Sequence, residues 1–284
     1  MALFSDVLLT VDYDRTLTAP DSTIPERNLE AIRYFMENGG AFTVNTGRSM
    51  PMARTFLDRV PVNAPLLLYN GALAYDTREN RILFSHTIPL DQAQTIHKCL
   101  ELFPDLMVEI QGLDYHYRFT DNPAWEAFNA ANYCACQAAA PEDNLGPFLK
   151  FSIYGKIRKP TVADLFTGTP EEIRRIDQAQ ETLHAQFGDA VEPVRSAPRI
   201  IDVQVNGVSK GRSARELQAA LGRKVLVCIG DAENDLTMLS AADYAFVPGD
   251  AILADRFPNV CPCTEGSVAD VIYKKIPEIL KNNT

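Results

Sequence analysis

The sequence predicts an α/β protein built on a doubly wound parallel sheet, with an α+β cap domain inserted into it. Apolar, β-branched segments alternate with amphipathic helical segments near both ends of the chain. Between these regions the pattern changes to hairpins and antiparallel strand signals over roughly the length of a domain. We therefore expect one core formed by residues 1–86 and 196–284, and a cap formed by residues 87–195.

The first quarter of the chain supplies the β-α-β-α-β order typical of a parallel sheet. Thr23 and Glu26 have the spacing of a capping box, with Thr23 as N-cap, and Asn38-Gly39-Gly40 provides the helix end. The expected elements are a strand at Ser5–Val11, a helix after Thr23, a strand at Ala41–Asn45, a helix at about 50–60 and a strand at Pro65–Gly71.

The middle of the chain has a different pattern. Thr169 to Glu172 repeats the capping-box spacing, now with a proline at the first helical position, and opens a helix that reaches about Phe187. Before it come a hairpin from Ala72–Asp76 and Arg81–Ser85, a helix at Leu90–Phe103, one or two antiparallel strands in Leu106–Phe119 and a strand in Phe148–Lys156.

The α/β alternation then returns, which assigns the last part of the chain to the core. Apolar strand signals follow one another with helical segments between and after them. The expected elements are strands at Ile200–Val205, Val225–Gly230 and Tyr244–Pro248, and helices at Lys210–Leu221 and Ser267–Leu280.

Composition excludes several classes of protein. The net charge is −10 and no Lys/Arg-rich run occurs, so we expect no nucleic-acid partner. No apolar run reaches the roughly 18 residues that span a bilayer, and the first residues lack the basic region of a signal peptide. We expect a cytoplasmic protein that does not enter membranes; no feature of the sequence sets its oligomeric state.

The six cysteines include two closely spaced pairs, Cys134 with Cys136 and Cys261 with Cys263. A zinc site from the two pairs is one alternative, but free, partly buried thiols are favoured, and we assign these cysteines no function. None of the four histidines falls in a metal-ligand spacing, so the sequence does not favour histidine-centred catalysis.

Carboxylates follow two of the expected core strands. Asp12 and Asp14 come directly after the first strand, and Asp231 with Asp235 follows the apolar segment Val225–Gly230. Ligands of open α/β sheets bind at the carboxyl ends of the strands. Like charges gathered at that edge repel one another, and a divalent cation such as Mg²⁺ removes this cost.

Groups that suit a phosphate lie after another core strand and at the start of a helix. Thr46, Gly47 and Arg48 follow the second strand, where a hydroxyl and the amides of a glycine turn can contact phosphate oxygens. Lys210 stands at a helix start, where the helix dipole disfavours a cation. A nearby anion would explain this lysine; a surface lysine at a frayed helix start is the alternative.

Four segments in this order resemble the motifs of the haloacid dehalogenase superfamily: "DYDRTLT", "NTGRS", the lysine of "GVSKG", and "GDAEND". The long insertion between the second and third motifs, with "YNGA" at residues 69–72 before it, resembles the cap of the Cof-type, or class IIB, phosphatases. The resemblance covers nearly the whole chain and implies a Rossmann-like core that binds Mg²⁺.

The resemblance also implies roles for individual residues. Asp12 would be the nucleophile that forms an aspartyl-phosphate, and Asp14 would protonate the leaving alcohol and then activate water. Mg²⁺ would bind the Asp12 carboxylate, the Asp14 backbone carbonyl and the Asp231 carboxylate. The phosphoryl group would be held by Thr46, Lys210, Asn234 and the backbone near Tyr13 and Gly47, with Asp235 and Arg48 in support.

The expected function is that of a Mg²⁺-dependent phosphatase for a small phosphomonoester, with a sugar phosphate favoured. The alternatives are a sugar phosphomutase of the same superfamily and a non-catalytic sugar-phosphate-binding protein. Arg15 stands where the better-known motif has glycine; it contacts either the leaving group or, as we favour, a surface acid. Asn70 is a further candidate for substrate contact.

Overall fold

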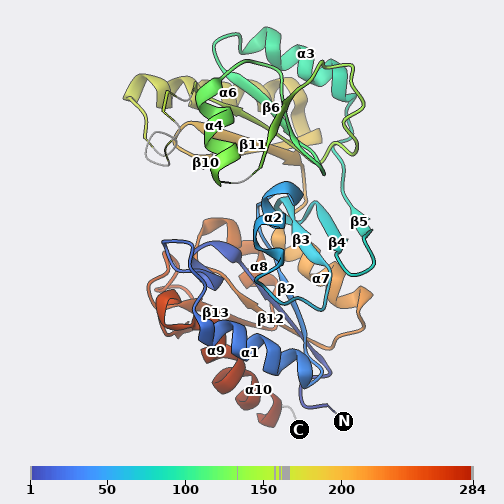
Figure 1. The fold of residues 1–284 in the computed structure, drawn as a ribbon, viewed down its shortest axis with the longest axis vertical. Helices are drawn as coiled ribbons and strands as arrows, with labels where there is room; N and C mark the ends of the chain where they lie inside the picture. Colours follow the sequence, from blue (N-terminus) through green and yellow to red (C-terminus); the bar gives the residue numbers. More distant parts are fainter. Residues whose placement is uncertain (1, 133, 157, 160, 162–166, 283–284) are drawn as a thin grey trace. The chain divides into compact units, whose positions relative to one another are not determined.

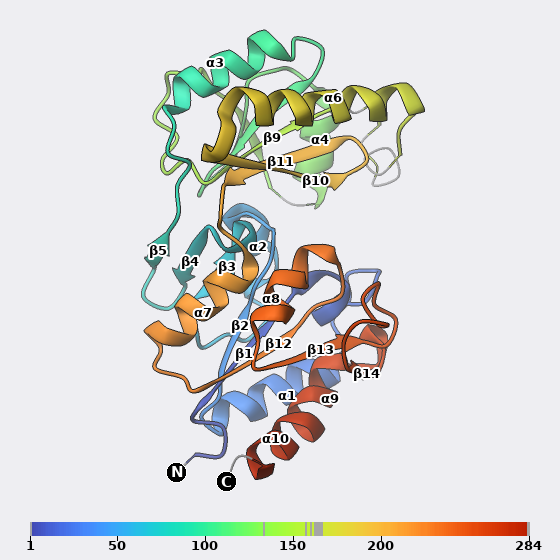
Figure 2. The same ribbon diagram turned by 180° about the vertical axis from the view of Figure 1, so that it is seen from behind.

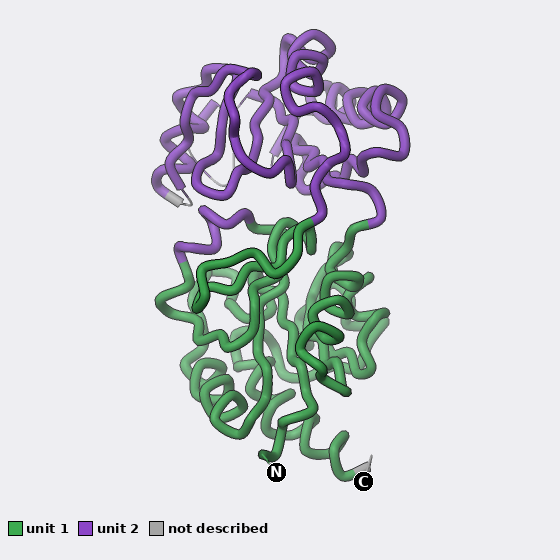
Figure 3. The backbone as a smooth tube through the Cα atoms, turned by 90° about the vertical axis from the view of Figure 1, so that its right-hand side faces the viewer, with its two compact units in different colours: residues 1–48, 56–85, 208–284 green, residues 49–55, 86–207 purple. Residues whose placement is uncertain are grey.

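The structure is a computed structural model that describes residues 2–132, 134–156, 158–159, 161 and 167–282. The chain forms two compact units (Figure 3). The first comprises residues 1–48, 56–85 and 208–284, and the second comprises residues 49–55 and 86–207.

A parallel sheet forms the centre of the first unit (Figure 1). Strand β1 (Val7–Val11) is fully buried and pairs in parallel with β2 (Ala41–Val44) on one side and β12 (Val225–Ile229) on the other. The parallel pairing continues through β13 (Tyr244–Pro248) to β14 (Asn259–Val260). The predicted doubly wound α/β sheet, formed from both ends of the chain, is therefore confirmed.

Helices cover both faces of this sheet, as Figures 1 and 2 show from opposite sides. On one face Leu8 and Leu226 pack with Leu217 of α7 (Lys210–Ala220) and Met238 of α8 (Leu236–Ala241). Four helical elements cover the other face: α1 (Glu26–Glu37), α9 (Ser267–Asp270), η6 (Val271–Lys275) and α10 (Ile276–Asn282). Strand residues alternate between the faces, so both layers are anchored in one apolar sheet.

The third predicted strand has a different partner from the one expected. Strand β3 (Leu66–Leu68) makes one parallel bridge, from Leu67 to Asn45, but otherwise pairs antiparallel with β4 (Leu73–Asp76). The short turn η2 (Tyr69–Gly71) reverses the chain between them, with left-handed backbone at Asn70. Strand β5 (Arg81–Ser85) completes this sheet and confirms the predicted hairpin.

The second unit contains a mostly antiparallel sheet in the order β10-β11-β9-β6-β7-β8. One apolar cluster lies under it and includes Val108, Phe151 and Val203 from three of its strands. The strands are β6 (Met107–Gln111), β7 (His116–Arg118), β8 (Cys136–Ala138), β9 (Lys150–Tyr154), β10 (Val191–Ala197) and β11 (Ile200–Val205). The helices are α3 (Gln92–Leu102), α4 (Pro123–Asn132) and α6 (Pro170–Phe187).

Two expectations about single elements are wrong. Thr23 does not cap α1: its amide and hydroxyl both donate to Asp21, and Pro25 precedes the helix. The strand Ile200–Val205 does not belong to the parallel sheet, because it pairs antiparallel with β9 and β10 in the second unit. By contrast, the capping box at Thr169 is confirmed, with both reciprocal hydrogen bonds formed.

The remaining elements are short. They comprise the helix α2 (Met50–Leu57) and the turns η1 (Tyr13–Leu17), η3 (Gly188–Ala190), η4 (Glu233–Asp235) and η5 (Cys263–Glu265). Among the described residues, no helix is both long enough and apolar enough to cross a membrane.

Candidate active site

Asp12 lies at the carboxyl end of the central strand. Its amide donates to the carbonyl oxygen of Ile229 at 2.9 Å, which extends the β1–β12 pairing by one residue. The chain then turns through η1, where Arg15 has a left-handed backbone with φ 58°. Asp12 is only 5% exposed, so the ligand-binding edge of the sheet carries a buried carboxylate.

A buried lysine joins this carboxylate to a second one. Lys210, the first residue of α7, donates from Nζ to Asp12 Oδ1 and to Asp235 Oδ1, each at 2.6 Å. Asn45 Nδ2 donates to the Lys210 carbonyl oxygen at 2.9 Å and thereby fixes the start of the helix. The cation at this helix start is therefore held by two anions, which outweigh the unfavourable helix dipole.

Asp231 lies beside the same cluster after β12. Its amide donates to Asp235 Oδ2 at 3.0 Å, and its own Oδ1 accepts from Thr16 Oγ1 at 3.3 Å. Gly230 allows this approach, because a Cβ there would lie 2.6 Å from the Asp235 side chain. One oxygen each from Asp12, Asp231 and Asp235 lies within 4.8 Å of the others.

The electrostatics of the three carboxylates indicate that the cluster lacks positive charge. Burial, and then the Asp235 carboxylate, raise the pKa of Asp12 well above its ordinary value despite Lys210. The same two causes raise the pKa of Asp231 to about 6. Burial alone would lower the pKa of Lys210, but the Asp12 and Asp235 carboxylates raise it overall. A divalent cation bound by these hard oxygen ligands would keep Asp12 and Asp231 ionised.

The groups expected to hold phosphate lie after β2. Thr46 is buried, and its Oγ1 accepts from the Arg48 amide at 3.2 Å. Its carbonyl oxygen accepts from the Asn70 amide at 3.1 Å, which connects this segment to η2. A Cβ at Gly47 would lie 2.7 Å from Asn70 Oδ1, so any side chain at this position would displace the Asn70 amide group. Thr46, Gly47 and Asn70 therefore lie next to one another in the fold, although Asn70 comes from a different turn.

Asp14 does not belong to the buried cluster of Asp12, Asp231 and Asp235 and is paired with Arg48. Arg48 donates from Nε to Asp14 Oδ2 at 2.9 Å and from Nη2 to Oδ1 at 2.7 Å, while its guanidinium lies 4.7 Å from the centre of the Tyr13 ring. The Asp14 side chain is about half exposed. This two-pronged contact uses both carboxylate oxygens and fixes Asp14 beside, not inside, the acidic cluster.

Arg15 and Asn234 are both exposed. The Arg15 amide donates to Thr18 Oγ1 at 3.3 Å. Its guanidinium partly opposes the rise that burial and Asp235 cause in the pKa of Asp231, and it adds to the lowering of the Asp250 pKa by hydrogen bonds from Cys263, so Arg15 lies within electrostatic reach of both acids. Asn234 belongs to η4, the turn that also carries Asp235.

Sequence reasoning did not single out Thr16 or Asn45, although both make contacts in this site. Both are buried polar residues: Asn45 directly follows β2, whereas Thr16 lies within the η1 turn, five residues after β1 ends. Buried polar groups require partners, so its place directly after an apolar strand is the signal that could have found Asn45, whereas no comparable signal marks Thr16.

Comparison with known proteins identifies the family to which this chain belongs. Residues 9–254 match the family model described as haloacid dehalogenase-like hydrolase. The chain is similar to 5-amino-6-(5-phospho-D-ribitylamino)uracil phosphatase YitU of Bacillus subtilis, with 23% identity over 86% of this chain and 87% of the relative. It is also similar to pyridoxal phosphate phosphatase YbhA of Escherichia coli, with 23% identity over 95% of this chain and 98% of the relative.

Solved structures share the fold. A haloacid dehalogenase-like hydrolase from Bacteroides thetaiotaomicron superposes with a TM-score of 0.79 and 18% identity, over 94% of this chain and 98% of that one. A subclass IIB sugar phosphatase, BT4131, superposes with a TM-score of 0.73 and 16% identity, over 95% and 99% of the two chains. These likenesses establish the fold of the whole chain, the insertion included.

Proposed function

Since this chain belongs to the family of haloacid dehalogenase-like hydrolases, we propose that it is a phosphatase that hydrolyses a small phosphomonoester through an aspartyl-phosphate intermediate. One observation carries the proposal: the buried Asp12 carboxylate at the end of β1 is held through one oxygen by Lys210. The arrangement leaves the second oxygen, Oδ2, to act as the nucleophile.

The chemistry has two steps. In the first, Asp12 Oδ2 forms a bond to phosphorus while the bond between phosphorus and the substrate's ester oxygen breaks, and Asp14 gives a proton to the departing alkoxide. In the second, Asp14 takes a proton from water, whose oxygen attacks the phosphorus and releases inorganic phosphate and the Asp12 carboxylate. Asp14 must leave Arg48 for these transfers, because Arg48 occupies both of its oxygens.

The phosphoryl oxygens need donors, and the residues around Asp12 provide them. We assign this role to Lys210, Thr46, Asn234 and the backbone amides near Tyr13 and Gly47. Lys210 also bridges Asp12 and Asp235 by donating to both, which offsets the repulsion between the two carboxylates. Asp235 is the positioning residue, because it orients Lys210 and accepts from the Asp231 amide.

Mg²⁺ fits the oxygen donors of this site. We propose that the Asp12 and Asp231 carboxylates and the Asp14 carbonyl oxygen hold the ion, with Asp235 close enough to support its water ligands. When bound, the ion neutralises the charge that develops on the phosphoryl group. The raised pKa values of Asp12 and Asp231 support this assignment, since both carboxyls lack a sufficient counter-charge in its absence.

For the substrate we propose a small phosphorylated metabolite, with a sugar phosphate as the first choice. The relatives are named for phosphate esters of small polar molecules: a ribitylamino-uracil, pyridoxal and HMP-PP. A panel of sugar phosphates, pyridoxal phosphate and nucleotides, with release of inorganic phosphate as the readout, identifies the preferred class. An isomerised sugar without phosphate release would instead indicate a phosphomutase.

The nucleophile is tested with Asp12→Asn. We expect phosphate release to fall by at least about a thousandfold, because an amide cannot form the acyl-phosphate. Trapping wild-type protein during turnover should yield a phosphorylated peptide that contains residues 7–18, and the variant should yield none.

Asp6→Asn is the matched control, because Asp6 stands just before the same strand, where it pairs with Lys224 on the surface. This variant should turn over substrate at the wild-type rate. Near-normal turnover by Asp12→Asn, with its circular dichroism unchanged, would exclude Asp12 as the nucleophile.

A further inference from the structure

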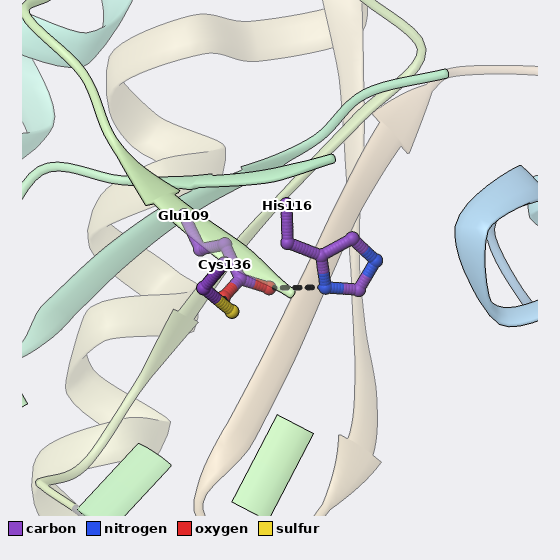
Figure 4. Close-up of side chains that lie close together, drawn as sticks. All are labelled: Glu109, His116 and Cys136. Atoms are coloured by element: carbon purple, nitrogen blue, oxygen red, sulfur yellow. Dashed lines mark hydrogen bonds and ion pairs between the residues drawn. The ribbon is translucent and has the colours of Figure 1, made fainter. Parts of the chain in front are cut away.

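A second group of metal-ligating side chains lies in the second unit, within its antiparallel sheet. Glu109 of β6, His116 of β7 and Cys136 of β8 each offer a ligand atom, and these atoms lie within 4.8 Å of one another (Figure 4). His116 Nδ1 is 3.1 Å from Glu109 Oε1, and Cys136 Sγ is 3.9 Å from Glu109 Oε2. Glu109 is fully buried and His116 is 2% exposed.

The register of the sheet brings these side chains together. Gln111 pairs with His116, so Glu109, two residues before Gln111, lies on the same face as His116. Cys136 is the register partner of His116 on β8. Three adjacent strands therefore place a carboxylate, an imidazole and a thiol on one face.

Neighbouring side chains already orient the ligands. Trp125 Nε1 and Tyr154 OH donate to Glu109 Oε2 at 2.6 and 2.9 Å, which turns Oε1 toward the imidazole. His116 Nε2 is 2.7 Å from Ser49 Oγ, which belongs to the same unit and leaves Nδ1 on the side of Glu109. Hydrogen bonds of this kind fix the ligands of protein metal sites from behind.

A further thiol lies beside the group. Cys134 lies within hydrogen-bonding reach of His116, where it adds to the rise that the Glu109 carboxylate causes in the pKa of that imidazole, and it adds to the rise that burial and Glu109 cause in the pKa of Cys136. Arg118, a cation on this face, is engaged by Asp121 and Glu126, at 2.5 and 2.8 Å. The group thus offers three clustered donors of mixed type, and the Cys134 thiol beside His116 provides a fourth.

We propose that Glu109, His116, Cys134 and Cys136 bind one Zn²⁺ ion. Thiolate, imidazole and carboxylate together suit zinc, whereas Mg²⁺ selects oxygen ligands alone. Ligands bonded to zinc at about 2.0–2.3 Å stand roughly 3.3–3.8 Å apart in a tetrahedron, and the ligand atoms of Glu109, His116 and Cys136 already lie within 4.8 Å of one another. The site would join β6, β7 and β8, and its role would be structural because four protein ligands leave no open position.

The competing state is a metal-free ion pair. Burial alone would lower the pKa of His116, but the Glu109 carboxylate raises it to about 9, so the imidazole is protonated at neutral pH. Zinc binding would displace this proton and those of the two thiols. The two states differ in whether sulfur is bonded to metal, which is directly measurable.

The experiment uses Co²⁺ as a spectroscopic substitute for zinc in the full chain after treatment with a chelator. We expect one equivalent of Co²⁺ to produce a sulfur-to-metal charge-transfer band in the near ultraviolet, which one equivalent of Zn²⁺ removes. The active site offers only oxygen ligands for a metal, so it produces no such band and Asp231→Asn should leave the band intact.

Cys136→Ser should abolish the band, and Cys261→Ser, a partly exposed thiol in the first unit, should retain it. Trp125→Phe should weaken zinc binding about 10- to 100-fold by releasing Glu109. X-ray absorption of the zinc-loaded wild type should detect two sulfur ligands, a measurement that needs no variant. Absence of the band and of sulfur ligation in the wild type would overturn the proposal and leave the ion pair as the native state.

Discussion

Lys210 is the residue on which the charge balance of the candidate site depends. It is buried and donates to two carboxylates at 2.6 Å, so its cation compensates only part of the charge of Asp12, Asp231 and Asp235. Buried charges without compensation cost several kcal/mol each. The site therefore has a deficit of positive charge that a metal ion can fill.

This deficit predicts how stability depends on pH. Asp231 has a folded-state pKa of about 6 against an ordinary value of 3.8, so between these values the folded protein binds more protons than the unfolded chain. Its contribution to stability is present below about pH 4 and is lost as the pH rises through 6. In EDTA, Asp231→Asn should gain roughly 2–3 kcal/mol relative to wild type between pH 4 and 7, measured by urea unfolding.

Asp250→Asn serves as the matched control for this measurement. Burial alone would raise the pKa of Asp250, but hydrogen bonds from Cys263 lower it overall, so its contribution changes only at more acidic pH. Relative to wild type, this variant should show little pH dependence between pH 5 and 7. Saturating Mg²⁺ should remove the advantage of Asp231→Asn, and a flat profile for that variant in EDTA would contradict the electrostatics described for the site.

The sequence predicts the places of single site residues where a charged side chain stands at the end of an apolar strand or at the start of a helix. The positions of Asp12, Asp231 and Lys210 relative to strand and helix ends follow from apolar runs and helix starts. The pairing of Asp14 with Arg48 did not follow, because the conformation of the η1 turn decides where this side chain points. The spacing of residues in the sequence does not determine the orientation of the Asp14 side chain.

Helix α6 illustrates a local signal that the structure confirms. Thr169 accepts from the Glu172 amide at 3.2 Å, and Glu172 accepts from the Thr169 amide at 2.8 Å. Thr169→Ala should therefore lower the free energy of unfolding by about 1 kcal/mol, as measured by chemical denaturation. Thr182→Ala in the same helix loses only a hydroxyl bond to Gln178 and should be neutral or slightly stabilising. Equal losses for the two variants would contradict the capping role.

The same four-residue pattern failed at Thr23 for an identifiable reason. Asp21 accepts hydrogen bonds from both the amide and the hydroxyl of Thr23, at 3.0 and 2.6 Å, so neither group is directed at the helix. A carboxylate two residues upstream competes with the capping box. An acidic residue at that distance is the signal that distinguishes Thr23 from Thr169.

The strand β11 was predicted in its place in the sequence but assigned to the wrong sheet. Its alternating pattern buries Ile201 and Val203 in the apolar cluster of the second unit, while Asp202 faces Ser152 on β9. Alternation of this kind is typical of antiparallel sheets, whereas β12 has the continuous apolar run of a parallel one. A short apolar segment thus identifies a strand, but whether its apolar residues alternate or run continuously indicates the type of sheet it joins.

At the scale of the whole molecule, two metals should act on two different units. Mg²⁺ at Asp12 and Asp231 should slow amide hydrogen exchange at the ends of β1 and β12 in the first unit. Zn²⁺, added to the Asp231→Asn protein, should slow exchange in β6, β7 and β8 of the second unit. Hydrogen exchange with peptide-level mass spectrometry distinguishes the two patterns, and zinc protection confined to the first unit would contradict the second metal site.

The second unit is inserted between the strands of the first unit, and this arrangement sets the order in which the protein can fold during synthesis. Strand β1 pairs with β12 across a sequence separation of 218 residues, so the central pair of the parallel sheet cannot form until most of the chain has left the ribosome. Residues 86–207 emerge earlier and contain their own apolar core. We therefore expect the inserted unit to fold first on the nascent chain, while β1 and β2 wait with exposed strand edges that chaperones can bind.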